Sequence, residues 1–252
     1  MHHQTTPLTP DLNSEPRTVG PAADSTDAAL REEAARYALL RRLTPTLRHH
    51  LVGEFQPIGM IAAMVDRRLQ AEQPNMVSLR ENSATLGKLS RDAAHNCLNI
   101  MTWIAPRGTD TVALHAGLQE CLGLLSTEFR FKGLVIVNEV QGPGLDGLAS
   151  LAVPLTALRS VLPAALLALG DETEGAADLH VSAEPGPGGA VQITLRREPA
   201  ERPAERAGST EYRALTWRDV EVLADAESVG FARLPGGARL MLSCEAAEKA
   251  IG

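Results

Sequence analysis

The sequence predicts an α+β protein in which a helical hairpin near residues 44–104 dimerises into a four-helix bundle and is followed by an α/β sandwich. Two observations carry this prediction. Apolar residues recur at helical spacing along two stretches of similar length, which a Gln-Pro-Asn break separates. Segments rich in β-branched or alternating residues follow, and Pro- and Gly-rich turns bound them, as is typical of strands. Strands and helices mixed in this way form an α+β sandwich.

The N-terminal region is expected to contain a tail and a short helix. Residues 1–26 are rich in Thr, Pro, Asp and Ser and lack the layout of a signal peptide, so we expect a disordered tail. Residues 27–43 are rich in Ala, Glu, Arg and Leu, which favours a helix. Thr44 and Pro45 are expected to end this helix and begin the next, with Thr44 as its N-cap, because proline suits the first turn of a helix.

The hairpin is predicted from two apolar stripes. The first comprises Leu47, Leu51, Phe55, Ile58, Ile61, Val65 and Leu69, and the second comprises Met76, Leu79, Leu86, Leu89, Ala93, Cys97, Ile100 and Ile104. Two helices joined by a short break form an antiparallel hairpin with an exposed apolar face. Two copies related by a two-fold axis bury that face in a bundle. The alternative is that later helices of the same chain cover it, and we favour the homodimer.

Residues 27–104 are thus assigned to the hairpin and residues 109–252 to a second domain. In the second domain we expect helices over 109–129, 155–169 and 216–226, strands over 134–140, 179–184, 190–196, 229–234 and 238–242, and a surface loop over 198–209. Thr216 is expected to cap the last helix.

The charge, the cysteines and the apolar runs of the sequence exclude several classes of function. The net charge of −7 argues against a nucleic-acid surface, which needs clustered Lys and Arg. Cys97, Cys121 and Cys244 are widely spaced in apolar stretches, so we expect buried free thiols, no disulfide and no metal site in a reducing cytoplasm. No apolar run reaches the length of a membrane span. The expected protein is therefore cytoplasmic, without a membrane or nucleic-acid partner.

A histidine pair on the first hairpin helix is the main candidate for chemistry. With Leu51, Phe55 and Ile58 in the bundle core, about 100° per residue places His49 opposite the core and His50 on its flank. A solvent-facing imidazole on a rigid helix is what phosphoryl transfer between proteins needs. Alone, an exposed helical histidine is more often an ordinary surface residue.

The segment Leu-Arg-His-His-Leu-Val-Gly-Glu-Phe-Gln-Pro-Ile, residues 47–58, resembles the H-box of sensor histidine kinases and dimeric histidine phosphotransferases. In that family, apolar residues follow the reactive histidine at two, six and nine positions, a register that His49 fits. The resemblance implies that His49 is the phosphoacceptor and that His50 is a helper or the alternative acceptor. It also implies a response-regulator receiver domain as partner, bound near Arg48, Val52 and Gln56.

Two departures argue against kinase and phosphatase chemistry. The family usually has an acidic base directly after the reactive histidine, where this chain has His50. Kinases with phosphatase activity place Thr or Asn four residues after that histidine, where this chain has Gly53.

The element order after residue 109 resembles the Bergerat-type ATP-binding domain of histidine kinases, in a degenerate form. The segment 162–169 contains no Asn where the family binds magnesium, and Arg-Glu-Pro-Ala at 197–200 stands where it has Asp-x-Gly-x-Gly. We therefore expect no nucleotide and no other cofactor.

The predicted function is a histidine phosphotransferase of a two-component phosphorelay, with a non-enzymatic pseudokinase scaffold as the alternative and a true kinase as a weaker one. The Asp171-Glu172 pair is expected to lie in a solvated turn, and His95, His115 and His180 are expected to be ordinary residues.

Overall fold

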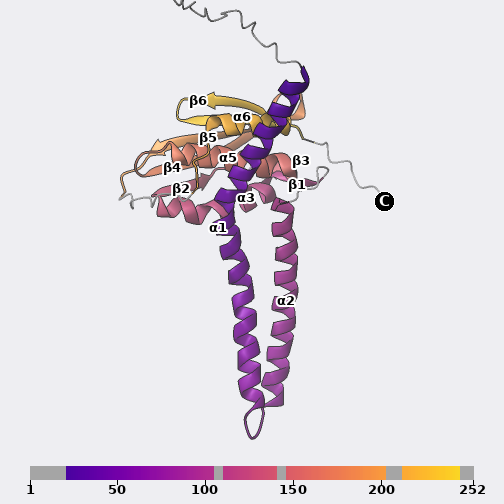
Figure 1. The fold of residues 1–252 in the computed structure, drawn as a ribbon. Helices are drawn as coiled ribbons and strands as arrows, with labels where there is room; N and C mark the ends of the chain where they lie inside the picture. The colour runs from indigo at the N-terminus through magenta and orange to yellow at the C-terminus, as the bar shows by residue number, and fades with distance from the viewer. Residues whose placement is uncertain (1–20, 105–109, 141–145, 203–211, 245–252) are drawn as a thin grey trace, which may run out of the picture.

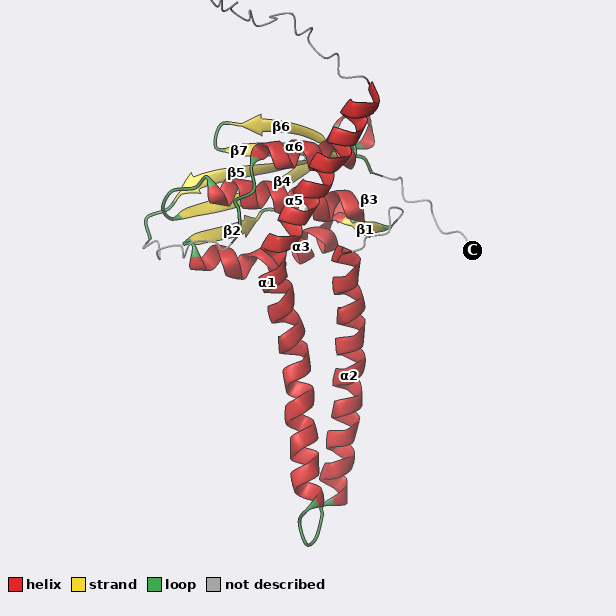
Figure 2. Cartoon of the chain, in the orientation of Figure 1, coloured by secondary structure: helices red, strands yellow, loops and turns green. Residues whose placement is uncertain are grey.

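The computed structural model describes residues 21–104, 110–140, 146–202 and 212–244. A long antiparallel pair of helices, α1 (Pro21–Leu69) and α2 (Met76–Ile104), projects from one side of an α+β domain (Figures 1 and 2). The first part of α1 lies across the helices of that domain, and the remainder of α1 forms the hairpin with α2 (Figure 1).

The first helix is longer than predicted and has no break at Thr44. It continues through Pro45 and Pro57 to Leu69, so the expected helix boundary at Thr44 is wrong. The Thr44 hydroxyl donates to the carbonyl of Leu40 at 2.7 Å, which is a contact of a helix interior and not of an N-cap. The helix also begins at Pro21, so residues 21–26, which were predicted as tail, are helical. Proline at the first position of a helix loses no internal hydrogen bond.

The second hairpin helix begins where the sequence predicts it. The Asn75 side chain accepts hydrogen bonds from the backbone N–H groups of Val77 and Ser78, both at 3.1 Å, and so caps the helix. Leu79 and Ala93 are buried against α1. The predicted break at 73–75 and the predicted helix after it are confirmed.

The α+β domain contains a five-stranded sheet with helices on one face (Figure 2). Its strands are β2 (Leu134–Asn138), β4 (Ala177–Pro185), β5 (Val191–Pro199), β7 (Gly237–Leu242) and β6 (Gly230–Leu234), in that spatial order. Only β2 and β4 run parallel in this sheet. The helices are α3 (Leu114–Phe131), α4 (Asp146–Ala149), α5 (Leu155–Asp171) and α6 (Trp217–Ala226), and the 3₁₀ turn η1 (Pro187–Gly189) lies between β4 and β5. The predicted α+β class is confirmed.

A small second sheet was not predicted. Strands β1 (Thr111–Ala113) and β3 (Ala152–Pro154) pair antiparallel, and β1 occupies residues expected to be helical. Three residues are too few to show strand alternation. The short helix α4 was also missed. The expected loop over 198–209 begins later than predicted, because Glu198 and Pro199 belong to β5, and most of its remainder lies outside the described residues.

The N-terminal half of α1 belongs to the core of the α+β domain. Ala35, Leu39, Leu43 and Leu47 are buried in the same apolar cluster as the inner face of the sheet. Burying an aliphatic side chain contributes about 1.5–3 kcal/mol. This packing explains why α1 stays helical through Pro45, since Leu43 and Leu47 flank that residue and are both buried.

Candidate functional site

The histidine pair lies on the exposed surface of α1, just beyond the α+β domain. The half-buried residues Leu51, Ile58 and Ile61 mark the side of α1 that faces α2. At about 100° per residue, His49 lies nearly opposite that side and His50 lies at its edge. Both side chains are exposed, in the directions that the sequence predicts.

The residues expected to bind a partner are also exposed. Arg48, Val52 and Gln56 lie on the outer surface of α1, and Val52 is 56% exposed. Within the described ranges, Arg48 forms no ion pair with a carboxylate. The segment from Thr44 to Gly53 carries Arg48, His49 and His50 and contains no carboxylate. This stretch of helix is therefore basic at its surface.

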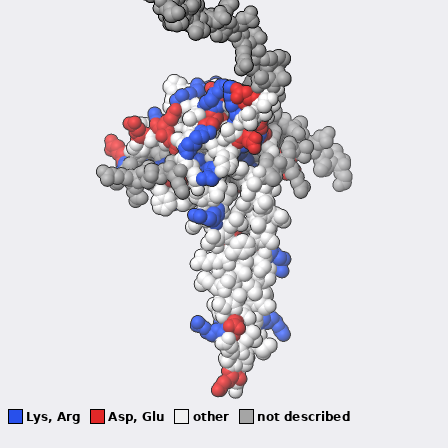
Figure 3. Space-filling view, in the orientation of Figure 1, with Lys and Arg blue, Asp and Glu red and all other residues white. Residues whose placement is uncertain are grey.

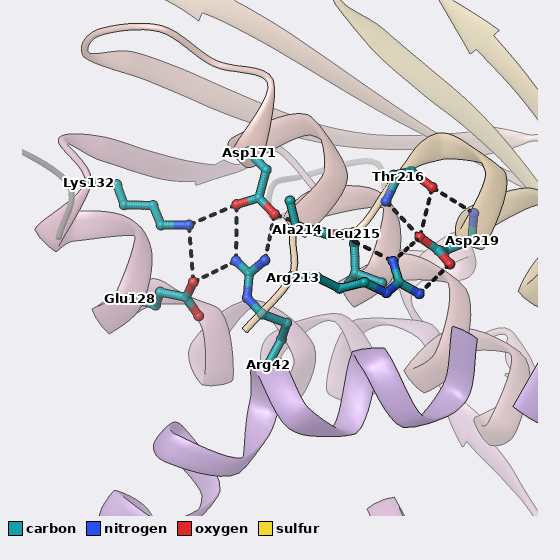
Figure 4. Close-up of polar contacts among 9 residues, drawn as sticks. All are labelled: Arg42, Glu128, Lys132, Asp171, Arg213, Ala214, Leu215, Thr216 and Asp219. Carbon is teal, nitrogen blue, oxygen red and sulfur yellow. Dashed lines mark hydrogen bonds and ion pairs between the residues drawn. The ribbon is translucent and has the colours of Figure 1, made fainter. Parts of the chain in front are cut away.

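A buried ion-pair cluster joins α1 to the α+β domain just before the histidines (Figure 4). Arg42 is only 3% exposed and donates to Asp171 at 2.5 and 3.0 Å and to Glu128 at 2.9 Å. Lys132 contacts the same two carboxylates at 2.9 and 3.2 Å. The backbone N–H of Leu215 also donates to Asp171, at 3.3 Å. Two cations and two anions thus balance each other where the ends of α3 and α5 meet α1.

Asp171 was expected in a solvated turn, and this expectation is wrong. Burial raises the pKa of its carboxyl, but the hydrogen bonds from Arg42 and Lys132 outweigh burial and hold that pKa below its ordinary value. The sequence does contain one signal for this cluster. Arg42 extends the helical row of the buried residues Ala35 and Leu39, and a charge on an apolar face needs a buried partner.

A second polar cluster supports the cap of α6 (Figure 4). Thr216 and Asp219 form a capping box, as the predicted role of Thr216 requires. Arg213 donates to both carboxylate oxygens of Asp219 at 2.8 Å. Burial raises the pKa of Asp219, and the hydrogen bonds from Arg213 and Thr216 outweigh it and lower the pKa to about 2.

A cavity of about 380 Å³ lies at the junction of α1, α2, α5 and α6, and its arginines are already paired. Arg159 donates to both oxygens of Glu120 and stacks on Trp103, with 4.8 Å from its guanidinium carbon to the ring centroid. Arg36 donates to Glu227 at 2.7 Å. Since each guanidinium already faces a carboxylate, the cavity offers no free positive charge to a polyphosphate.

The two segments compared above with the nucleotide site of the resembled family lie in regular secondary structure. Every residue of α5 from Thr156 to Gly170 is buried, and three of them, Thr156, Arg159 and Ser160, line the cavity beside α1. Residues 197–199, where the resembled family has a glycine-rich loop, are part of β5, and Pro199 pairs with Ala177 of β4. The described residues contain no cluster of three or more His, Cys, Asp or Glu side chains placed to hold a metal ion.

The remaining candidates are only partly as expected. Cys97, Cys121 and Cys244 are free, but only Cys121 is buried, and burial raises the pKa of its thiol. The expectation of three buried thiols is therefore wrong for two of them. His180 has an unpredicted partner, because its Nδ1 lies 2.7 Å from Oε1 of Glu139.

No family model and no curated protein matches the chain. Among solved structures it is similar to histidine kinase AdeS of Acinetobacter baumannii, with 14% identity over 75% of this chain and 96% of that one and a TM-score of 0.39. A histidine kinase from Burkholderia phymatum is 12% identical over 87% of this chain and 99% of that one, with a TM-score of 0.40. The blue-light activated histidine kinase of Erythrobacter litoralis is 12% identical over 75% and 64%, with a TM-score of 0.39.

These structural neighbours are histidine kinase domains, but scores this low mark a loose likeness from which no activity follows. None of the helices in the described ranges has the length and apolar character required to cross a bilayer.

Proposed function

We propose that this protein is a histidine phosphotransferase in which His49 exchanges a phosphoryl group with the aspartate of a response-regulator receiver domain, without binding ATP. The observation that carries the proposal is the exposed imidazole of His49 on the outer side of a packed helix. The H-box register of the surrounding residues supports the same role.

The transfer needs only the imidazole and an aspartyl phosphate. A ring nitrogen of His49 attacks phosphorus with its lone pair, and the bond between phosphorus and the aspartyl oxygen breaks. The carboxylate leaves with the electron pair, and the proton on the other ring nitrogen passes to solvent, so that the imidazole ring of the phosphohistidine is neutral. The reverse step returns the group to a second carboxylate. His50, which lies about 100° around the helix, is assigned the role of helper or alternative acceptor.

The burial of α5 and the paired arginines of the cavity support transfer without a nucleotide. Thr156 to Gly170 are buried, and the two arginines of the nearby cavity are neutralised by Glu120 and Glu227. A phosphoryl group must then come from a protein partner.

A second copy of the chain is the proposed cover for the hairpin. Exposed apolar side chains line it, among them Phe55, Met64, Leu69, Met76, Val77, Leu98, Met101 and Ile104. The α+β domain sits at one end and leaves them uncovered, and most of the hairpin surface in Figure 3 is uncharged. A groove lined by Val65, Leu69, Met76 and Leu79 runs between the helices near their turn. Two such faces packed together form a four-helix bundle.

The test is transfer of labelled phosphate from a panel of receiver domains to the full chain. We expect acid-labile label on the wild type and none on His49→Gln, while His50→Gln is only slowed. His95→Gln is the matched control, because His95 is an exposed histidine on the other hairpin helix, and it should label normally.

Labelling of His49→Gln together with loss in His50→Gln would move the acceptor by one residue. A wild type that takes no label from any receiver would overturn the proposal and favour the pseudokinase scaffold.

A further inference from the structure

The cavity at the junction of α1, α2, α5 and α6 has the size and the position of a small-molecule site. Its volume of about 380 Å³ lies within the range of ligand pockets, which form preferentially where domains meet. Two of its lining residues, Ile104 and Ala226, are exposed, so a molecule can enter it from solvent. Its walls also include Leu39, Leu43 and Trp103, and such apolar side chains favour an organic molecule over a group of waters.

Buried polar side chains gather on one wall of this cavity. The described ranges contain four buried polar or charged residues, and three of them, Thr156, Arg159 and Ser160, line it from α5. Spacings of three and four residues place these side chains together on one side of the helix. A buried polar group is destabilising unless it is hydrogen-bonded, so each of the three needs a partner.

The charges of the cavity are balanced within the chain. Arg159 donates to Glu120, and Ser160 accepts a hydrogen bond from Arg36 at 3.2 Å. Arg36 also donates to Glu227, which lines the opposite wall from α6, at 2.7 Å. A charged ligand would add an unpaired charge to a partly buried site, so the cavity favours a neutral one.

The hydroxyl of Thr156 differs from these groups because no described residue forms a hydrogen bond with it. Elsewhere in the chain, Thr44, Thr85 and Thr173 each donate to the carbonyl four residues earlier. Thr156 is the second residue of α5, so the residue four positions earlier, Ala152, belongs to β3 and not to the helix. Thr156 is only 8% exposed and lines the cavity, so its hydroxyl is available to a molecule bound there.

We propose that this cavity binds a small neutral molecule with an apolar body and one hydrogen-bonding group. The body lies against Leu39, Leu43 and Trp103, and the Thr156 hydroxyl bonds the polar group. Both hairpin helices and the α+β domain line the cavity, so the bound molecule stabilises the junction between these two parts of the protein. This inference is independent of the phosphoryl transfer proposed for His49.

The test uses benzamide, which is neutral and combines a ring with a hydrogen-bonding amide. Benzoate has nearly the same shape but a negative charge. The chain has two tryptophans, so Trp217→Phe leaves Trp103 as the one that reports on the cavity. In this full-length protein we expect benzamide to change the Trp103 emission saturably, with a dissociation constant of about 1 mM, as for other ligands of this size. Benzoate should bind at least about ten-fold more weakly.

Two variants locate the binding in this background. Thr156→Val keeps the shape of the side chain and removes the hydroxyl, so it should weaken benzamide about five-fold. It should leave unchanged the binding of toluene, which has no polar group. Ala226→Leu places a larger side chain at the cavity and should abolish the binding of both probes, whereas Ala29→Leu, at an exposed position of α1, is the matched control and should bind as before.

Each result supports or overturns a part of the proposal. If neither benzamide nor toluene gives a saturable change, the cavity is not a ligand site. Equal binding of benzoate would overturn the neutral class of ligand, and unchanged benzamide binding by Thr156→Val would overturn the role of the hydroxyl. Unchanged binding by Ala226→Leu would place the probes outside the cavity.

Discussion

Replacing Arg42 with leucine tests whether the buried ion-pair cluster fastens α1 to the α+β domain. The substitution removes the guanidinium from a side chain that is 2% exposed and leaves Asp171 and Glu128, at 11% and 21%, with Lys132 as their one remaining cation in the cluster. Breaking a buried ion pair costs about 3–5 kcal/mol. Lys132 keeps its contacts at 2.9 and 3.2 Å, so we expect the lower end, about 3 kcal/mol.

Urea unfolding followed by the fluorescence of Trp103 and Trp217 measures this loss. With a denaturant dependence of about 3 kcal/mol per molar, the midpoint should fall by about 1 M. Arg48→Leu is the matched control on the same helix, and its exposed side chain should change stability by less than about 0.5 kcal/mol. If Arg42→Leu lowers the free energy of unfolding no more than the control does, the ion-pair cluster does not hold α1 against the α+β domain and the reasoning is refuted.

The pH dependence of the same variant has a definite sign. Because the pKa of Asp171 is lowered in the folded protein, its charged form stabilises the fold above the unfolded pKa of about 3.9. That contribution is lost as the pH falls through the folded pKa. The stability difference between wild type and Arg42→Leu should therefore shrink below about pH 4.

Two further predictions concern the partner and the absent nucleotide. Phe55→Asp changes a residue that is 51% exposed in the single chain, so the helix should persist while the dimer dissociates. Sedimentation velocity of this variant should show a monomer. A wild type that is already monomeric at micromolar concentration would contradict the prediction. Calorimetric titration with ATP and magnesium should give no binding heat, because the arginines of the cavity beside α5 are already paired with Glu120 and Glu227. A micromolar dissociation constant would restore the kinase alternative.

Periodicity predicted α2, α5 and the strand hairpins well because their patterns are local. The continuation of α1 through Pro45 could not be predicted from a local pattern, because it depends on the packing of Leu43 and Leu47 into the core of the α+β domain. The pairing of β1 with β3 was missed for a similar reason, because neither three-residue strand has a pattern without its partner.

The candidate site also combines one feature that the sequence predicts with one that it does not. The outward direction of His49 follows from helical spacing within one segment, and so it was predictable. Arg42 and Asp171 are 129 residues apart in the sequence, so their contact depends on the tertiary fold.

The continuity of α1 has a mechanical consequence. One unbroken helix of 49 residues, about 70 Å long, is built into the α+β domain at one end and forms half of the hairpin at the other. A rotation of that domain about the hairpin axis must therefore twist α1 or pull Leu39 and Leu43 out of the core. In a dimer, the same helix would act as a spacer that sets the separation of the two domains and holds each one in register with its own His49.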